Sequence, residues 1–169
     1  ILILSQQITT LTFFKYPSFT EKLWAFGMMQ FAHSPLKKVK GLEFYKLLGS
    51  GKKNFDPKPD WSVYGLLQVW ENEETAKDFF AHSKLYVRYQ NHSAQQLTFY
   101  LKSIKAHGQW SKQNPFEESD DLDAGNEMIA VITRATIKFT MLKRFWDYVP
   151  TSQKDLVDNP SLLFTAGVG

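Results

Sequence analysis

Histidines are the side chains in this sequence best suited to hold a metal, and there are four: His33, His82, His92 and His107. Zinc sites need several closely spaced His or Cys ligands, but the sequence has no H-x-x-x-H pair and no cysteine. A haem iron needs only one strong protein ligand. His82 and His92 fall in an expected helix, which could present an imidazole to a cavity lined by a sheet. They are therefore the candidate metal ligands, and the alternative for each is an ordinary surface or core histidine.

Two cations stand in or near expected strands. Arg134 is in the middle of the alternating stretch VITRATI, and Lys46 is in a strand that ends in Gly49-Ser50-Gly51. Because an unpaired charge is costly in a core, Arg134 must lie on an exposed face, form an ion pair, or clamp a ligand carboxylate such as a haem propionate. Lys46 is a second candidate for the same cofactor-binding role. The GSGKK sequence does not fit a phosphate loop, because Lys46 and Lys53 stand where that motif needs glycine and Ser or Thr.

The elements that position these residues follow from hydrophobic periodicity. Alternation predicts strands over 10–16, 41–51, 61–70 and 96–106, and the two prolines of 52–60 predict a loop between the second and third strands. Helices are expected over 18–32, where Ser18 and Glu21 have capping-box spacing, and over 72–93. The first helix is apolar around most of its girth, which predicts packing on a sheet and on another element. The order β-α-β-β-α-β predicts an α+β, ferredoxin-like unit over residues 1–114.

A second unit begins after the acidic linker 115–127. A strand is expected over 128–139, a helix over 140–149 that ends near Pro150, and a strand over 161–169. Gly49 and Gly51 correspond to Gly167 and Gly169, which indicates internal duplication. Residues 128–169 would then be the start of an incomplete ferredoxin-like unit. Since such a sheet has an unpaired edge, we expect either that the chain is part of a longer protein or that a domain-swapped dimer completes it.

Composition narrows the class of protein. The chain has 169 residues, a net charge of +3 and 15% aromatic residues, so it can build a large aromatic core or enclose an apolar ligand. The charge is too weak to indicate nucleic acid, and no apolar run is long enough to span a membrane. We expect a cytoplasmic protein. The lysines between Lys37 and Lys58 form a basic stretch, and we expect either a solvated surface or peripheral contact with anionic lipid headgroups there.

Several phrases resemble the spheroidene monooxygenase family, whose members are acyclic carotenoid ketolases. They are LWAFGMMQFA (23–32), FYKLLGSG (44–51), QWSKQNPF (109–116), ITRATI (132–137) and the glycine-ended stretch 161–169, in the order expected for the family. The resemblance implies a dimeric α+β barrel of two ferredoxin-like units, haem b as cofactor, and oxidation of an apolar, carotenoid-like substrate with molecular oxygen. It identifies no axial ligand in this sequence.

On this interpretation the protein provides an apolar tunnel for a polyene, with Trp24, Phe44, Phe99 and Trp110 as expected lining residues. Each of them could equally be ordinary core. The partners would be the substrate, an electron-donor protein and a second copy in a homo-oligomer. Two other functions fit the same fold: a cofactor-free monooxygenase acting on an electron-rich aromatic, and a non-catalytic module that binds a hydrophobic ligand.

Overall fold

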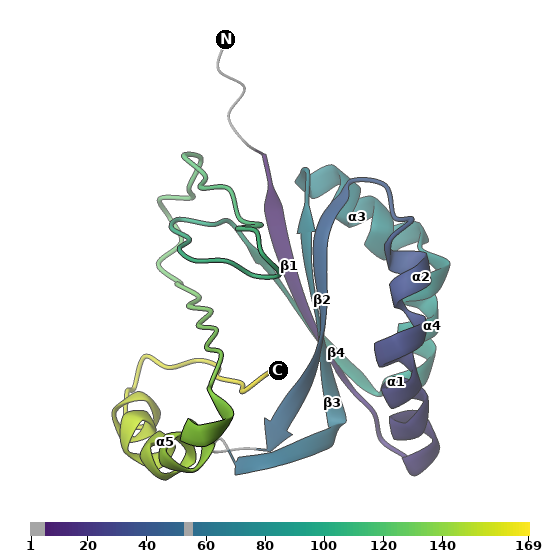
Figure 1. Cartoon of the computed structure of the whole chain (residues 1–169). Helices are drawn as coiled ribbons and strands as arrows, with labels where there is room; N and C mark the ends of the chain where they lie inside the picture. The colour runs from purple at the N-terminus through teal and green to yellow at the C-terminus, as the bar shows by residue number, and fades with distance from the viewer. Residues whose placement is uncertain (1–5, 53–55) are drawn as a thin grey trace.

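The structure is a computed structural model that describes residues 6–52 and 56–169, with a four-stranded sheet and the helices that precede residue 95 on one side of it (Figure 1). The elements, in chain order, are β1 (Ile8–Lys15), α1 (Phe19–Phe31), α2 (His33–Leu36), β2 (Leu42–Lys52), β3 (Asp56–Trp70), α3 (Glu73–His82), α4 (Lys84–His92), β4 (Gln95–Leu101), the 3-10 helix η2 (Phe139–Met141) and α5 (Leu142–Val157).

The sheet has the strand order β2-β3-β1-β4, and the neighbouring strands are antiparallel. This order, together with the succession β1-α1-β2-β3-α3-β4, is the ferredoxin-like arrangement. The predicted fold class is therefore confirmed. Its two crossovers place α1 to α4 in one layer against one face of the sheet (Figure 1).

Alternation in the strands decides which side chains meet the helices. Phe14 and Tyr64 lie opposite each other in the β1–β3 register, as do Ile8 and Trp70. All four are buried in the core between the sheet and the helices. Within this core the indole Nε1 of Trp70 donates to Thr10 Oγ1 at 2.9 Å. The residues between these positions point to the other face, which the helices do not cover.

The helix layer differs from the prediction in two places, of which one is the short helix α2, which was not expected. Residues 73–92 form two helices, because Ser83 has extended backbone angles (φ −71°, ψ 120°). Ser83 ends α3 and also caps α4, where its Oγ accepts from the Tyr86 amide. A serine side chain can compete for backbone hydrogen bonds in this way, which interrupts a helix that periodicity alone would continue.

The expected loop over 52–60 is partly wrong. Strand β2 continues to Lys52 and β3 starts at Asp56, and Gly51 lies opposite Pro59 in their register. Residues 56–62 of β3, which precede Val63, have no partner in the β1 register, so a proline there removes no ladder hydrogen bond from that side of the sheet. Lys53, part of the GSGKK sequence, lies outside the described residues.

The second unit is formed only in part. Its helix is present as α5, but it runs on to Val157 and does not end near Pro150; a helix can pass one proline at the cost of a hydrogen bond. No strand forms over 128–138 within the described chain. Residues 161–169 make one isolated bridge, between Ser50 and Val168. The division of the chain at residues 114 and 127 stays a prediction.

The two Gly-x-Gly segments pair with each other. The amides of Gly49 and Gly51 donate to the carbonyls of Gly169 and Gly167 at 2.8 and 3.0 Å, and the Gly169 amide donates to the Gly49 carbonyl at 3.2 Å. Strand β2 is at the edge of the sheet, so the C-terminal segment covers backbone groups that would otherwise be unpaired. Among the residues described, no helix is long and apolar enough to cross a membrane.

Candidate functional site

The sheet face turned away from the helices α1 to α4, here called the open face, is an apolar surface that all four strands build. The register places Lys46, Leu67, Leu11 and Phe99 side by side across all four strands. Phe44, Leu48, Leu67 and Val69 are buried there as a second core cluster. The open face is thus mainly apolar, with Lys46 among its apolar side chains.

Segments that follow β4 cover part of the open face, and they lie on the side of the sheet opposite α1 to α4 (Figure 1). Trp110 and Phe116 pack against the open-face cluster, and the Trp110 ring lies edge-on to Phe44 with centroids 5.9 Å apart. From the C-terminal segment, the Phe164 ring contacts both Phe13 and Phe99 at 5.3 Å. The open face is therefore partly covered by aromatic side chains, and Leu97 at its edge stays 46% exposed.

Trp110 begins a tight turn that has no glycine. Its amide donates to the Gln113 carbonyl at 2.7 Å, and Ser111 and Lys112 between them both have positive φ, 54° and 69°. Left-handed backbone in non-glycine residues costs about 1–3 kcal/mol each, and such strain is kept mostly where a function needs the geometry. The turn points Ser111 at the sheet, where Lys46 Nζ donates to its Oγ at 2.6 Å.

Lys46 and Arg134 both reach this turn. Lys46 Nζ lies 5.4 Å from the centroid of the Phe44 ring, and the Arg134 guanidinium lies 5.8 Å from the Trp110 ring. Arg134 Nη1 also donates to the Gln109 carbonyl at 3.5 Å. Both cations lie at aromatic rings, and these hydrogen-bond partners, Ser111 and the Gln109 carbonyl, are neutral. Two such cations can attract a carboxylate.

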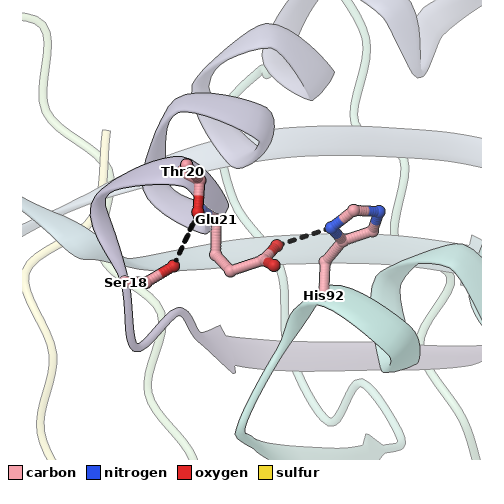
Figure 2. Close-up of polar contacts among 4 residues, drawn as sticks. All are labelled: Ser18, Thr20, Glu21 and His92. Carbon is pink, nitrogen blue, oxygen red and sulfur yellow. Dashed lines mark hydrogen bonds and ion pairs between the residues drawn. The ribbon is translucent and has the colours of Figure 1, made fainter.

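His92 lies on the other side of the sheet, at the end of α4. Figure 2 shows the carboxylate of Glu21 reaching from the first turn of α1 to the His92 ring, with Oε2 2.5 Å from Nδ1. The imidazole also stacks on Trp24, with centroids 3.9 Å apart and planes at 11°. Ser18 accepts from the Glu21 amide, so half of the predicted capping box forms, while the Glu21 side chain bonds His92.

This end of the helix layer is an aromatic cluster. Trp24 contacts Tyr16 at 6.1 Å and Tyr89 at 5.5 Å between ring centroids. Burial raises the pKa of Tyr16 and of Tyr89 far above the ordinary value of a phenol. Neither hydroxyl has a hydrogen-bond partner among the described residues. Both tyrosines are therefore held neutral in an apolar setting.

The other histidines are placed differently. The His82 side chain is 76% exposed and pairs with Asp78, one turn earlier in α3, at 2.9 Å. His33 Nδ1 lies 3.0 Å from the hydroxyl of Tyr45, and His107 is exposed in the loop after β4. Within the described ranges, no three His, Asp or Glu side chains come together as a metal cage would need.

The sequence-predicted site residues thus form two groups. Lys46 and Arg134 meet Phe44 and Trp110 on the open face, where Phe99 also lies. His92 and Trp24 meet on the helix side. His82 belongs to neither group, since it is exposed and pairs only with Asp78 among the contacts described above. The sheet separates the two groups, so one ligand cannot contact both.

Comparison with known proteins places the chain in a family. Over 164 residues, 96% of the chain, it is 34% identical to spheroidene monooxygenase from Cereibacter sphaeroides, of which it covers 50%. Over the same length it is 30% identical to spheroidene monooxygenase from Rhodobacter capsulatus, of which it covers 68%. The chain belongs to the spheroidene monooxygenase family. It spans between half and about two thirds of the length of these two relatives.

The resemblance of the sequence motifs to the spheroidene monooxygenase family is thereby confirmed. No family model matches the chain. Among solved structures, it is similar to SnoaB, a cofactor-independent oxygenase from Streptomyces nogalater, with 10% identity, a TM-score of 0.43, and 60% of this chain and 96% of that one covered. A dimeric ferredoxin-like protein of unknown function from Jannaschia sp. CCS1 gives 12% identity, a TM-score of 0.44, and coverages of 57% and 98%. Likenesses this weak assign no residue roles.

In this member of the spheroidene monooxygenase family, sequence reasoning missed several residues of the two groups. Ser111 and Phe164 gave no periodic signal, because both act through contacts made far along the chain. Alternation in the first strand puts Phe13 and Leu11 on one face, and the alternation of β2 and β4 adds Leu48 and Leu97 to the same face. Glu21 was assigned to the helix cap alone.

Proposed function

We propose that the protein is a monooxygenase that oxidises an acyclic, carotenoid-like substrate with molecular oxygen, with haem as its redox cofactor. The observation that carries the proposal is the similarity to spheroidene monooxygenases along 96% of the chain. Inserting oxygen into an unactivated C–H bond is beyond ordinary side chains, and haem would supply that chemistry. Two electrons are also needed to reduce the second oxygen atom to water, and we expect an electron-donor protein to deliver them.

The chain's own contribution would be to bind the substrate and exclude water. The aromatic open face suits a polyene, because its side chains offer apolar contact along several strands and few polar groups. Phe44, Phe99 and Trp110 are the residues that we propose for this contact. Trp24 lies on the helix side and could line only a site there.

Of the two histidines proposed as haem ligands, His92 fits better. A metal-ligating histidine usually donates its other ring N–H to a carboxylate, which fixes the tautomer and strengthens the ligand. Glu21 holds Nδ1 of His92 in this way, and the side chain is 34% exposed, so Nε2 is the ligating nitrogen that we propose. His82 also pairs with a carboxylate, but it lies in solvent, where nothing encloses a cofactor.

Lys46 and Arg134 fit a ligand carboxylate, but not one of a haem held by His92. They stand on the opposite side of the sheet, so the two placements are alternatives. A haem on the open face would have its propionates near Lys46 and Arg134 and would need an axial ligand from another residue.

An absorption spectrum of the full-length protein, purified with haem supplied and passed through gel filtration, tests the proposal. We expect a Soret band that co-elutes with the protein, and the elution volume also tests the predicted homo-oligomer. Loss of the band in His92→Ala, with a shifted band in Glu21→Gln, supports the helix-side placement, and His82→Ala is the matched control.

Weaker haem retention in Lys46→Gln and Arg134→Gln, with His92→Ala unchanged, supports the open-face placement. A colourless protein that still oxidises a substrate would overturn the haem part of the proposal and favour a cofactor-free monooxygenase. A colourless protein that binds an acyclic carotenoid without turnover would overturn the enzymatic part as well.

A further inference from the structure

Helix α1 exposes a row of large apolar side chains that nothing in the described chain covers. Phe19, Leu23, Phe26 and Phe31 are between 52% and 80% exposed, and we call them the outer α1 face. Within the described chain, the ring of Phe26 has the Trp61 ring as a neighbour, at 5.2 Å between centroids. Single exposed apolar residues are ordinary, but four on one helix of 13 residues form a patch of the kind that marks an interaction site.

The outer α1 face is separate from the inner face of the helix, which is already buried. Ala25 and Met28 are buried against the sheet. A helix that is apolar on both faces is stable only if both meet an apolar environment. The prediction that α1 packs on a sheet and on another element is thus confirmed, since Trp24 of α1 stacks on His92 and contacts Tyr89, both in α4. The outer α1 face is a further apolar surface whose four side chains stay mostly exposed.

A hollow of about 450 Å³ runs along this face. Gly27 lies in its lining, and the nearest atoms to an added side chain there would belong to Phe31, at 3.6 Å. Arg88, which α4 contributes, stands at the rim, and the other lining residues are Thr20, Leu23, Trp24, Met28 and Phe31. An apolar trough with one cation at its edge matches an acyl chain joined to an anionic headgroup.

Cations flank the outer α1 face along the chain. Lys22 is in its first turn, and three exposed lysines, Lys37, Lys38 and Lys40, follow directly after α2. The one acidic residue of α1, Glu21, is held by His92. The basic stretch of the sequence does not form a single surface, since Lys46 is on the open face with Ser111. Its first three lysines nevertheless follow within nine residues of the end of α1, and all three are exposed.

We infer that the outer α1 face binds the surface of an anionic lipid bilayer, with its Phe and Leu side chains in the acyl region and the lysines and Arg88 at the phosphates. Interfacial helices combine Phe and Leu on one side with Lys and Arg beside them in this way. A protein partner would be a poorer match, because the cores of protein interfaces are depleted of lysine. The inference does not depend on haem or on turnover.

Co-sedimentation of the full-length protein with vesicles of phosphatidylcholine containing one-third phosphatidylglycerol tests this. Leu23→Ser with Phe31→Ser should lower the partition coefficient on the order of 100-fold, because each removed side chain is worth about a factor of ten. Replacing Lys37, Lys38 and Lys40 by Gln should lower it by about 100-fold, from a factor of about five for each lysine. High salt and pure phosphatidylcholine should weaken the binding of the unchanged protein in the same way.

Matched variants control for size and charge. Phe139→Ser removes a phenylalanine that is 88% exposed elsewhere in the chain, and Lys105, Lys112 and Lys143 changed to Gln remove the same three charges. Both controls should bind as the unchanged protein does. The inference is overturned if the unchanged protein does not bind, if the controls lose as much as the α1 variants, or if the α1 variants bind normally. A change of oligomeric state in Leu23→Ser with Phe31→Ser would also overturn it, by making the face a contact between copies.

Discussion

Removing the Phe164 ring should release the C-terminal segment from the edge of the sheet. Phe164 is 45% exposed and touches two rings, Phe13 and Phe99, each at 5.3 Å. Burying about half of such a side chain gives about 1 kcal/mol, and the aromatic geometry adds up to about 1 kcal/mol. We therefore expect Phe164→Ala to lower the local free energy of opening by about 1–2 kcal/mol, while the free energy of global unfolding changes less.

Hydrogen exchange measured by NMR can isolate this effect. The amides of Gly49 and Gly51 donate to the carbonyls of Gly169 and Gly167, so their protection reports directly on the docked segment. Their exchange should become about 5- to 30-fold faster in Phe164→Ala, since each 1.4 kcal/mol is a factor of about ten. The amide of Leu67, in the centre of the sheet, serves as an internal reference.

Phe139→Ala is the matched control, because that ring is almost fully exposed. Unchanged exchange at Gly49 and Gly51 would refute the reasoning, as it would show that the Phe164 ring does not hold the segment. Equal acceleration at Gly49, Gly51 and Leu67 would refute it too, because the segment would then open only with the whole fold.

Three further perturbations have expected outcomes. Burial raises the folded-state pKa of Tyr16 above 10.0, so its contribution to stability is complete below pH 10 and is lost as pH rises through the folded pKa. Urea unfolding above pH 10 should therefore become less steeply dependent on pH in Tyr16→Phe, and an unchanged slope would contradict this. Trp70→Phe leaves Thr10 without its indole donor and should cost about 1–3 kcal/mol in urea unfolding, with Thr10→Val in a double-mutant cycle showing the coupling. Glu21→Gln and His92→Ala should show a coupling energy of about 0.5–1 kcal/mol near neutral pH, and additive effects would mean that the pair contributes nothing.

The ferredoxin-like core could be predicted from the sequence because its signals are local. Strand β1 shows why: Leu11 and Phe13 alternate with Thr12 and Phe14, and the structure sends the two sets to opposite faces. Its connections are short, so the element order left few topologies. The N-cap of α1 at Ser18 is likewise a matter of three residues.

What the sequence could not reveal depends on contacts between distant residues. The repeated Gly-x-Gly indicates duplication, but nothing in the pattern indicates that the two copies pair with each other. The extended stretch 128–138 has the alternation of a strand, and a strand forms only where a partner supplies hydrogen bonds. Within the described chain it has none, so periodicity predicted a strand that the structure does not form.

The candidate site was predictable as residue types and not as an arrangement. The sequence predicts Lys46 and Arg134 as candidates to bind a ligand carboxylate, and both lie at aromatic rings. Which side of the sheet His92 would face depends on how α4 packs after the break at Ser83, and helical periodicity carries no information on that break.

The position of the sheet between the two groups also limits how an apolar substrate could reach them. Trp24 lines the hollow on the outer α1 face and stacks on His92, so a haem ligated by His92 would lie next to the proposed lipid surface. A polyene could then react without leaving the bilayer. A site at Lys46 and Arg134 would instead require the polyene to leave the lipid and cross to the open face, under Trp110 and Phe164. The two placements therefore make different predictions for turnover in vesicles. Only the helix-side site makes turnover in vesicles fall in proportion to the lost membrane binding, and neither placement makes turnover in detergent depend on membrane binding.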